Sequence, residues 1–163
     1  MRYADITTCD LANGKNLGIV LWCQGCSLDC PGCHGGCAHN PDEGREFDSK
    51  AEALLFKELQ RPQLKRLTLS GGHPLEPYNI DTCLDICKRI KHVRPDLQIW
   101  CYTGWLWEDV KDLEIMKYLD VLVDGPYVES RRDISLAWRG SSNQRIIDVK
   151  ASLKTGKVII IED

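Results

Sequence analysis

Short apolar runs alternate with segments of helical periodicity along most of the chain, and this alternation constrains the fold more than any other feature. The strand candidates are residues 17–23, 66–70, 97–102, 121–124, 146–149 and 158–161. Several of them are continuous apolar runs, which are typical of strands covered on both faces of a sheet. The spacing of apolar residues predicts helices over 49–59, 80–92 and 107–118, the first with Asp48 as its N-cap.

The order of these elements predicts an α/β fold. Strand–helix–strand units join through right-handed crossovers, which produce a mostly parallel sheet. The units are too few for a closed eight-stranded barrel, so an open or partial (β/α) barrel is expected. No internal repeat and no linker rich in Pro, Gly or Ser divides the 163 residues, and we expect residues 1–163 to form a single domain.

Net charge and hydropathy argue against two classes of partner, nucleic acids and membranes. The chain has 21 Lys and Arg against 24 Asp and Glu, a net charge of −3, so no overall positive field attracts a phosphate backbone and nucleic acid is not expected as a partner. The longest apolar run near the start, residues 17–23, is far shorter than the roughly 20 residues of a spanning helix, and the first ten residues lack the layout of a signal peptide. We expect a cytoplasmic protein without a membrane partner.

Cysteine is unusually frequent in this chain. Five of the nine cysteines fall within fifteen residues: Cys23, Cys26, Cys30, Cys33 and Cys37. In a chain without a secretion signal, crowded cysteines bind metal or carry redox chemistry more often than they form structural disulfides. The spacing C-x3-C-x2-C of Cys26, Cys30 and Cys33 suits a soft metal or an iron–sulfur cluster.

A zinc site is the alternative interpretation of the same loop. Residues 23/26 and 30/33 form two C-x2-C pairs, and His34, Cys37 and His39 lie beside them. The two pairs are only three residues apart, whereas zinc ribbons usually separate such pairs by about 12 to 20 residues so that two knuckles can converge. A non-catalytic zinc-binding interaction module therefore remains the competing hypothesis from another functional class.

The cysteine loop and a glycine pair each follow a predicted strand. In parallel β/α folds, functional groups lie on the loops that leave the carboxyl ends of the strands. The cysteine loop follows the first predicted strand, and the sequence Ser-Gly-Gly-His-Pro at 70–74 follows the second. Two glycines allow the backbone to approach a ligand that a Cβ atom would block, although a tight strand-to-helix turn explains the pair equally well.

The ordered set of motifs resembles a known family. C-x3-C-x2-C followed by an aromatic residue, here His34, is similar to the cluster loop of radical S-adenosylmethionine enzymes. Over nearly the whole chain, the segments NGKNLGIVLWCQGCSLDCPGCH, LTLSGGHPLEP, IWCYTGW, DVLVDGPYVE and WRGSSNQRIIDV resemble, in order, the activating proteins of anaerobic ribonucleoside-triphosphate reductases. The resemblance implies that Cys26, Cys30 and Cys33 hold a 4Fe-4S cluster and leave one iron open to S-adenosylmethionine.

The resemblance also implies a reaction and its partners. The reduced cluster would cleave S-adenosylmethionine to methionine and a 5′-deoxyadenosyl radical, which takes hydrogen from a glycine Cα of the large subunit of the reductase. A low-potential donor such as flavodoxin or ferredoxin would supply the electron. Activation of another glycyl-radical enzyme is the alternative within this class. The residues implied in cofactor binding are Gly32, Cys33, His34, Gly71, Gly72 and His73.

Two positions depart from the family pattern. His73 stands where relatives usually carry an acid, and we expect its imidazole near the amino group of S-adenosylmethionine. Cys37 lies outside the three-ligand spacing, and a fourth thiolate would close the open iron, so we expect an inert or oxidation-prone side chain there.

Overall fold

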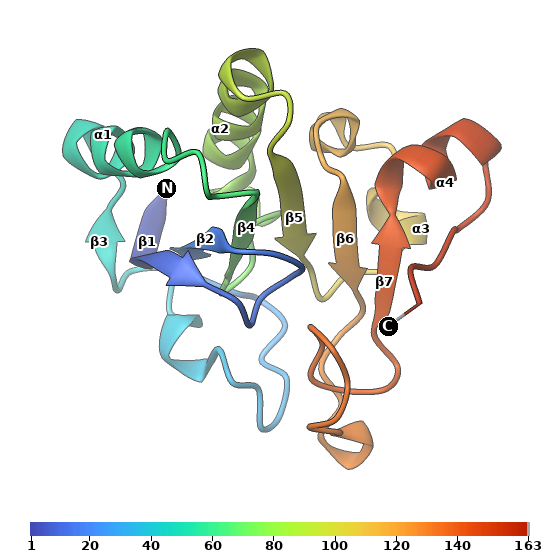
Figure 1. Ribbon diagram of the computed structural model, residues 1–163. Coiled ribbons are helices and arrows are strands. Elements are labelled where there is room, and N and C mark those ends of the chain that lie inside the picture. Colours follow the sequence, from blue (N-terminus) through green and yellow to red (C-terminus); the bar gives the residue numbers. More distant parts are fainter. Residues whose placement is uncertain (163) are drawn as a thin grey trace.

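A single seven-stranded sheet organises the chain (Figure 1). The computed structural model describes residues 1–162, apart from the side chain of Cys37. The strands are β1 (Arg2–Asp10), β2 (Gly18–Cys23), β3 (Arg45–Glu46), β4 (Arg66–Gly71), β5 (Gln98–Tyr102), β6 (Val121–Asp124) and β7 (Arg145–Asp148). The α-helices are α1 (Ser49–Glu58), α2 (Ile80–Val93), α3 (Trp107–Val110) and α4 (Val149–Thr155), and the 3-10 turns are η1 (Gly36–Ala38), η2 (Glu114–Lys117) and η3 (Glu129–Arg131).

The sheet is mixed, with a parallel centre and antiparallel edges. Its order is β3-β1-β2-β4-β5-β6-β7. Strands β2, β4, β5 and β6 are parallel, whereas β1 and β3 extend one edge antiparallel and β7 closes the other edge antiparallel to β6. The expectation of an α/β fold is confirmed, and the described sheet is open between β3 and β7.

Four predicted strands and two predicted helices are confirmed, and their predicted ends differ from the observed ends by at most one residue. The predicted strands 17–23, 66–70, 97–102 and 121–124 are β2, β4, β5 and β6, and the predicted helices 49–59 and 80–92 are α1 and α2. The side chain of Asp48 accepts hydrogen bonds from the N–H groups of Lys50 and Ala51, as the N-cap prediction requires. The predicted strand 146–149 ends one residue early, because Asp148 caps α4 through the N–H of Ala151 (2.9 Å).

Two predicted elements were wrong. Residues 107–118 do not form one helix: α3 ends at Val110, and Leu113 is extended (φ −67°, ψ 140°) before the turn η2 begins. That break turns Ile115 and Met116 into the core. Residues 158–161 do not form a strand, because Ile160 makes only an isolated bridge to Ile147 in β7.

The two faces of the sheet carry different hydrophobic clusters. Alternate residues of a strand point to opposite faces. The larger cluster joins Leu69 and Ile99 of the sheet to Leu55 of α1 and Ile86 of α2, whereas Trp100 belongs to a smaller cluster. The smaller cluster contains Trp100, Val121, Val123 and Ile146, and Tyr102, Trp138 and Ile161 pack against it.

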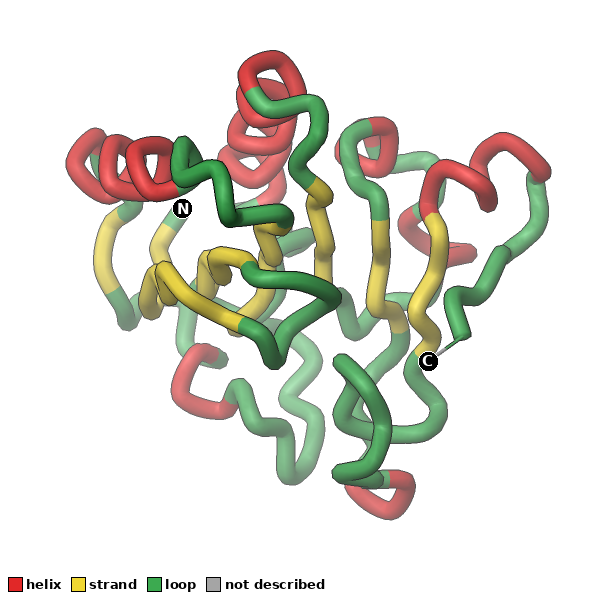
Figure 2. The backbone as a smooth tube through the Cα atoms, viewed as in Figure 1, coloured by secondary structure: helices red, strands yellow, loops and turns green. Residues whose placement is uncertain are grey.

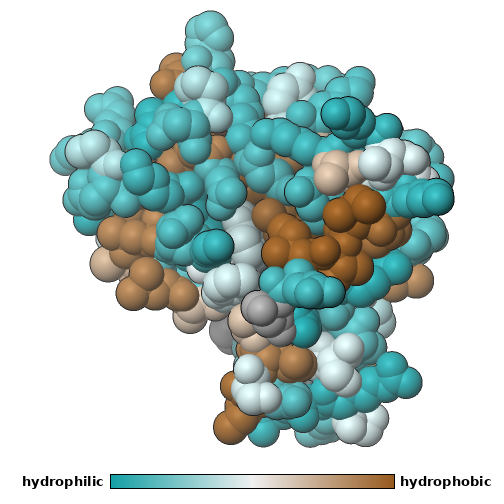
Figure 3. All heavy atoms as spheres, turned by 45° about the vertical axis from the view of Figure 1, so that its right-hand side comes forward, coloured by the Kyte–Doolittle hydropathy of each residue, from teal (hydrophilic) through white to brown (hydrophobic). Residues whose placement is uncertain are grey.

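Long loops gather at the carboxyl ends of the parallel strands. Figures 1 and 2 show the loops after β2 and after β6 side by side at that end, with only short helical turns among them. At the C-terminal side, Figure 3 shows an apolar surface patch, and the exposed large hydrophobic residues of that part of the chain are Leu153, Ile159 and Ile160. None of the described helices combines the length and the apolar character needed to cross a membrane.

Candidate active site

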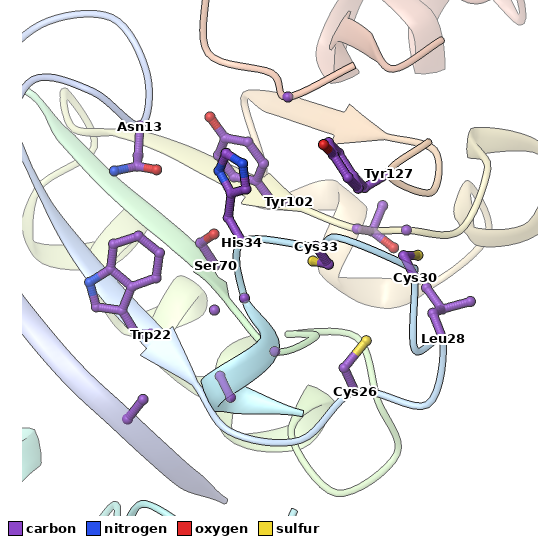
Figure 4. Close-up of a pocket in the computed structure, with 18 of the residues that line it drawn as sticks. Asn13, Trp22, Cys26, Leu28, Cys30, Cys33, His34, Ser70, Tyr102 and Tyr127 are labelled. Carbon is purple, nitrogen blue, oxygen red and sulfur yellow. The ribbon is translucent and has the colours of Figure 1, made fainter. Parts of the chain in front are cut away.

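A cavity of about 540 Å³ lies where the loops meet the open face of the sheet (Figure 4). The cysteine loop supplies Cys26, Leu28, Cys30, Cys33 and His34 to its wall. The strands and the loops that follow them supply Trp22, Ser70, Gly71, Gly72, Tyr102, Thr103, Gly125 and Tyr127, and the β1–β2 loop supplies Asn13. The structure therefore brings together most of the residues that the sequence singled out.

Backbone hydrogen bonds fold the cysteine loop back on itself. The N–H of Cys26 donates to the carbonyl of His39 (2.9 Å), and the N–H of Cys33 donates to the carbonyl of Cys30 (3.1 Å). Gly32 has φ of +71°, a conformation that glycine adopts without strain. The three thiols are free and half-buried, so they are open to the cavity while the loop backbone is held in place.

The arrangement of the cysteines in the loop fits a multinuclear cluster better than a zinc ribbon. Cys23 does not face the loop: it is fully buried in the main core, with its sulfur 3.8 Å from that of Cys83, so the 23/26 pair cannot act as a zinc knuckle. The sulfurs of Cys26, Cys30 and Cys33 are not gathered within 4.8 Å of one another, the span of a single-ion site. Three soft donors around a cavity of this size suit a larger group.

The glycine pair allows two backbone segments to pack closely. A Cβ atom on Gly71, whose φ is +100°, would lie 2.5 Å from the carbonyl oxygen of Cys23, and one on Gly72 would lie 2.4 Å from that of Gly25. The N–H of Gly72 donates to the carbonyl of Cys23 (2.8 Å), and the N–H of His73 donates to that of Gly25 (2.8 Å). Both glycines line the cavity, but the close backbone approach that requires them is to the start of the cysteine loop.

His73, which the sequence analysis places near S-adenosylmethionine, is not among the residues that line the cavity. Its Nδ1 is 3.1 Å from Oε1 of Glu76, its Nε2 is 2.6 Å from the hydroxyl of Thr103, and its ring packs edge-on against Trp105 at 4.2 Å. Burial lowers the pKa of His73 and outweighs the opposing effect of Glu76, so the ring is neutral at pH 7. Both ring nitrogens already have partners in the interior.

Glu76 is a residue of the site that was not predicted from the sequence. Its carboxylate, in a residue that is only 4% exposed, accepts hydrogen bonds from the N–H (2.9 Å) and the hydroxyl (2.6 Å) of Ser27, the residue after Cys26. Burial raises the pKa of Glu76, but the hydrogen bonds from Ser27 and His73 outweigh it and hold the pKa below its ordinary value. The available signal was the spacing in GGHPLEP, which puts an acid one turn after His73.

The other walls of the cavity are held by buried polar contacts. Arg66, fully buried in β4, donates to the carbonyl of Asn13 (2.7 Å) and to the carboxylate of Asp10 (2.7 Å), which fixes the β1–β2 loop over the cavity. The hydroxyl of Tyr102 donates to the carbonyl of Trp138 (2.7 Å). His34 is exposed, and its ring lies 5.8 Å from that of Tyr127, so it forms part of the mouth.

Comparison with known proteins shows the family to which the chain belongs. Residues 12–147 match the family described as 4Fe-4S single cluster domain. Relatives named anaerobic ribonucleoside-triphosphate reductase-activating protein include those of Pasteurella multocida (38% identical over 152 residues, 90% of this chain and 96% of the relative), of Enterobacteria phage T4 (37% over 146 residues, 90% and 93%) and of Escherichia coli K12 (34% over 148 residues, 88% and 96%). The chain belongs to the family of anaerobic ribonucleoside-triphosphate reductase-activating proteins.

Proposed function

We propose that this protein activates an anaerobic ribonucleoside-triphosphate reductase by generating a glycyl radical on its large subunit. The observation that carries the proposal is the placement of Cys26, Cys30 and Cys33, three half-buried free thiols, around one cavity at the carboxyl ends of the parallel strands. These residues would hold three irons of a 4Fe-4S cluster. When bound and reduced, the cluster supplies the electron that cleaves S-adenosylmethionine into methionine and a 5′-deoxyadenosyl radical.

The protein's own contribution is to hold the thiolates and to enclose the reactants. Burial raises the pKa of Cys26, so its thiol is protonated in the metal-free protein and must release that proton when metal binds. The cavity volume of about 540 Å³ suits a nucleoside-sized ligand, and Trp22, Tyr102 and Tyr127 provide walls that limit the access of water. We assign Cys33, His34, Gly71 and Gly72 to the cofactor side of this cavity. Gly32 does not line the cavity and contributes through the positive φ that shapes the loop before Cys33.

The arrangement of layers supports an open (β/α) barrel of the radical S-adenosylmethionine type. Helices α1 and α2 contribute to the large core on one face of the sheet. Trp22, Ser70 and Tyr102 line the cavity. Trp22 pairs with Ser70, and Tyr102 pairs with Val123, which belongs to the smaller cluster on the other face. In such barrels the helices lie outside and the reaction takes place inside, near the carboxyl ends of the strands.

A second cavity supports a protein substrate. It measures about 350 Å³ and shares the lining residues Asn13, His34, Tyr102 and Gly140 with the first, so the two cavities adjoin. Its outer wall comes from the segment 132–139, which includes the highly exposed Ile134. An extended peptide carrying the target glycine can reach the reactive cavity along this path. The electron would come from a low-potential donor such as flavodoxin or ferredoxin.

The test is reconstitution under anaerobic conditions followed by activation of the reductase. We expect iron and inorganic sulfide in the wild-type protein, and a glycyl radical detected by electron paramagnetic resonance after addition of S-adenosylmethionine, a reductant and the reductase. Cys26→Ala, Cys30→Ala and Cys33→Ala should each lose the cluster and the radical. Cys9→Ala, at an exposed position of β1, is the matched control and should retain both.

Two outcomes would contradict the assignment. One tightly bound zinc without sulfide in the wild-type protein would favour the non-catalytic zinc module. Loss of the cluster in Cys37→Ala, with retention in one of the three ligand variants, would show that the ligand set is wrong. The side chain of Cys37 lies outside the described part of the structure, so this variant tests the prediction from spacing alone.

A further inference from the structure

A buried carboxylate lies beside one of the three cysteines. A sulfur of Cys26, a ring nitrogen of His73 and a carboxylate oxygen of Glu76 all lie within 4.8 Å of one another. Among the described residues, these form the only group of three Cys, His, Asp or Glu side chains so closely spaced. His73 and Glu76 do not line the cavity, so the pair approaches Cys26 from the protein side.

The carboxylate also fixes the backbone next to Cys26. One oxygen of Glu76 accepts from both the N–H and the hydroxyl of Ser27. The segment that carries Glu76 is itself tied down, because Asn79 donates from Nδ2 to the carbonyls of Gln24 (2.9 Å) and His73 (3.0 Å). The position of Cys26 is therefore coupled to the 73–79 segment by two buried hydrogen bonds of Asn79 and two part-buried hydrogen bonds between Ser27 and Glu76.

We propose that Glu76 is a positioning residue that fixes the Cys26–Ser27 backbone and makes the reduction potential of the bound cluster more negative, through a buried charge beside the Cys26 sulfur. The inference rests on the proposed function, since it assumes that Cys26 is a cluster ligand. It gives the carboxylate a role that does not depend on contact with S-adenosylmethionine.

The sign of the effect follows from electrostatics. One-electron reduction adds negative charge to the cluster and its thiolates, and a neighbouring carboxylate makes that addition less favourable. Solvent screens this charge less than that of a surface carboxylate because Glu76 is only 4% exposed, and no Lys or Arg side chain among the described residues forms a salt bridge with it. Groups just behind the metal ligands commonly tune a site in this way. A more negative potential makes the reduced cluster a stronger donor for the cleavage reaction.

Glu76→Gln removes the charge of the Glu76 side chain and keeps its shape. Glutamine keeps the length of the side chain and a carbonyl oxygen that can accept from Ser27, but it carries no charge. We expect this variant to bind as much iron and sulfide as the wild type and to show a more positive midpoint potential. The potential is measured without S-adenosylmethionine, by titration with dithionite as the electron donor and detection of the reduced cluster by electron paramagnetic resonance.

Glu129→Gln is the matched control. Glu129 is exposed, and its carboxyl carbon would lie 2.9 Å from a Cβ on Gly32, so it places a solvated charge against the same cysteine loop. Solvent screening should make its effect on the potential much smaller than that of Glu76→Gln. Glu76→Ala removes the hydrogen bonds as well as the charge, and we expect a reduced yield of cluster from it.

The outcomes are distinct. A Glu76→Gln midpoint equal to that of the wild type, more negative than it, or no more shifted than that of Glu129→Gln would overturn the inference while leaving the proposed function intact. Failure of the wild type to assemble any cluster would overturn both. Full cluster yield in Glu76→Ala would refute the positioning role.

Discussion

Replacement of Gly72 by alanine tests whether the glycine pair serves the packing of backbone segments. The φ of Gly72 is not positive, so alanine meets no conformational penalty there and the effect is steric. The added methyl group would lie 2.4 Å from the carbonyl oxygen of Gly25 and 2.6 Å from that of Ala38. Real Cβ atoms essentially never come within 3.0 Å of another heavy atom, so the Gly25 oxygen must retreat by about 0.6 Å.

That displacement of the Gly25 carbonyl oxygen disturbs hydrogen bonds that order the cysteine loop. The Gly25 carbonyl accepts from the N–H of His73 (2.8 Å), and the Ala38 carbonyl accepts from the N–H of Gly25 (2.7 Å). Overpacking of a well-packed site costs about 1 to 3 kcal/mol, and two rigid backbone contacts place Gly72→Ala in the upper half of that range. Because Gly25 precedes Cys26, we also expect activity to fall by on the order of tenfold, as misplaced catalytic groups do.

The assay is urea unfolding of the metal-free protein, followed by measurement of glycyl-radical formation after reconstitution. Gly36→Ala is the matched control, since a Cβ there meets no atom within 4 Å among the described residues beyond its chain neighbours, and its φ is not positive. It should change the free energy of unfolding by no more than about 0.5 kcal/mol. Equal unfolding free energies for the two variants would refute the steric argument.

Two further predictions concern ion pairs. Asp10→Ala leaves the guanidinium of Arg66 buried without its carboxylate and should lower the free energy of unfolding by about 3 to 5 kcal/mol in urea titrations; a loss below 1 kcal/mol would mean that backbone carbonyls suffice for Arg66. Burial raises the pKa of Asp120, but hydrogen bonds from Lys150, Lys91 and the N–H of Ile99 outweigh it and leave the pKa below 3.8. The stability contributed by the Asp120 carboxylate is therefore complete above pH 3.8 and is lost as pH falls through the lowered pKa of the folded state. The destabilisation by Asp120→Asn should be largest at pH 7 and shrink below pH 3.8. A difference in unfolding free energy between wild type and variant that does not change with pH would contradict this sign.

The sequence determined the features that depend on local spacing. Continuous apolar runs located β2, β4, β5 and β6, and helical periodicity located α1 and α2, because burial on both faces or on one stripe leaves a pattern within a few residues. The spacing of Cys26, Cys30 and Cys33 likewise predicted these residues as candidate ligands, and the strand before them predicted the end of the sheet at which they lie.

Tertiary structure decided the features that depend on partners distant in the chain. Strand β1 has no continuous apolar run, and its place in the sheet depends on antiparallel pairing with β2. Cys23 faces the core because it shares the strand face that α2 covers, where it meets Cys83 sixty residues away. His73 points to Thr103 at the end of β5, thirty residues on, which leaves Glu76 to reach the cysteine loop. Sequence spacing fixes which side chains are neighbours along one element, but the direction of a buried polar side chain is set by the hydrogen-bond partner that the packing of other elements brings to it.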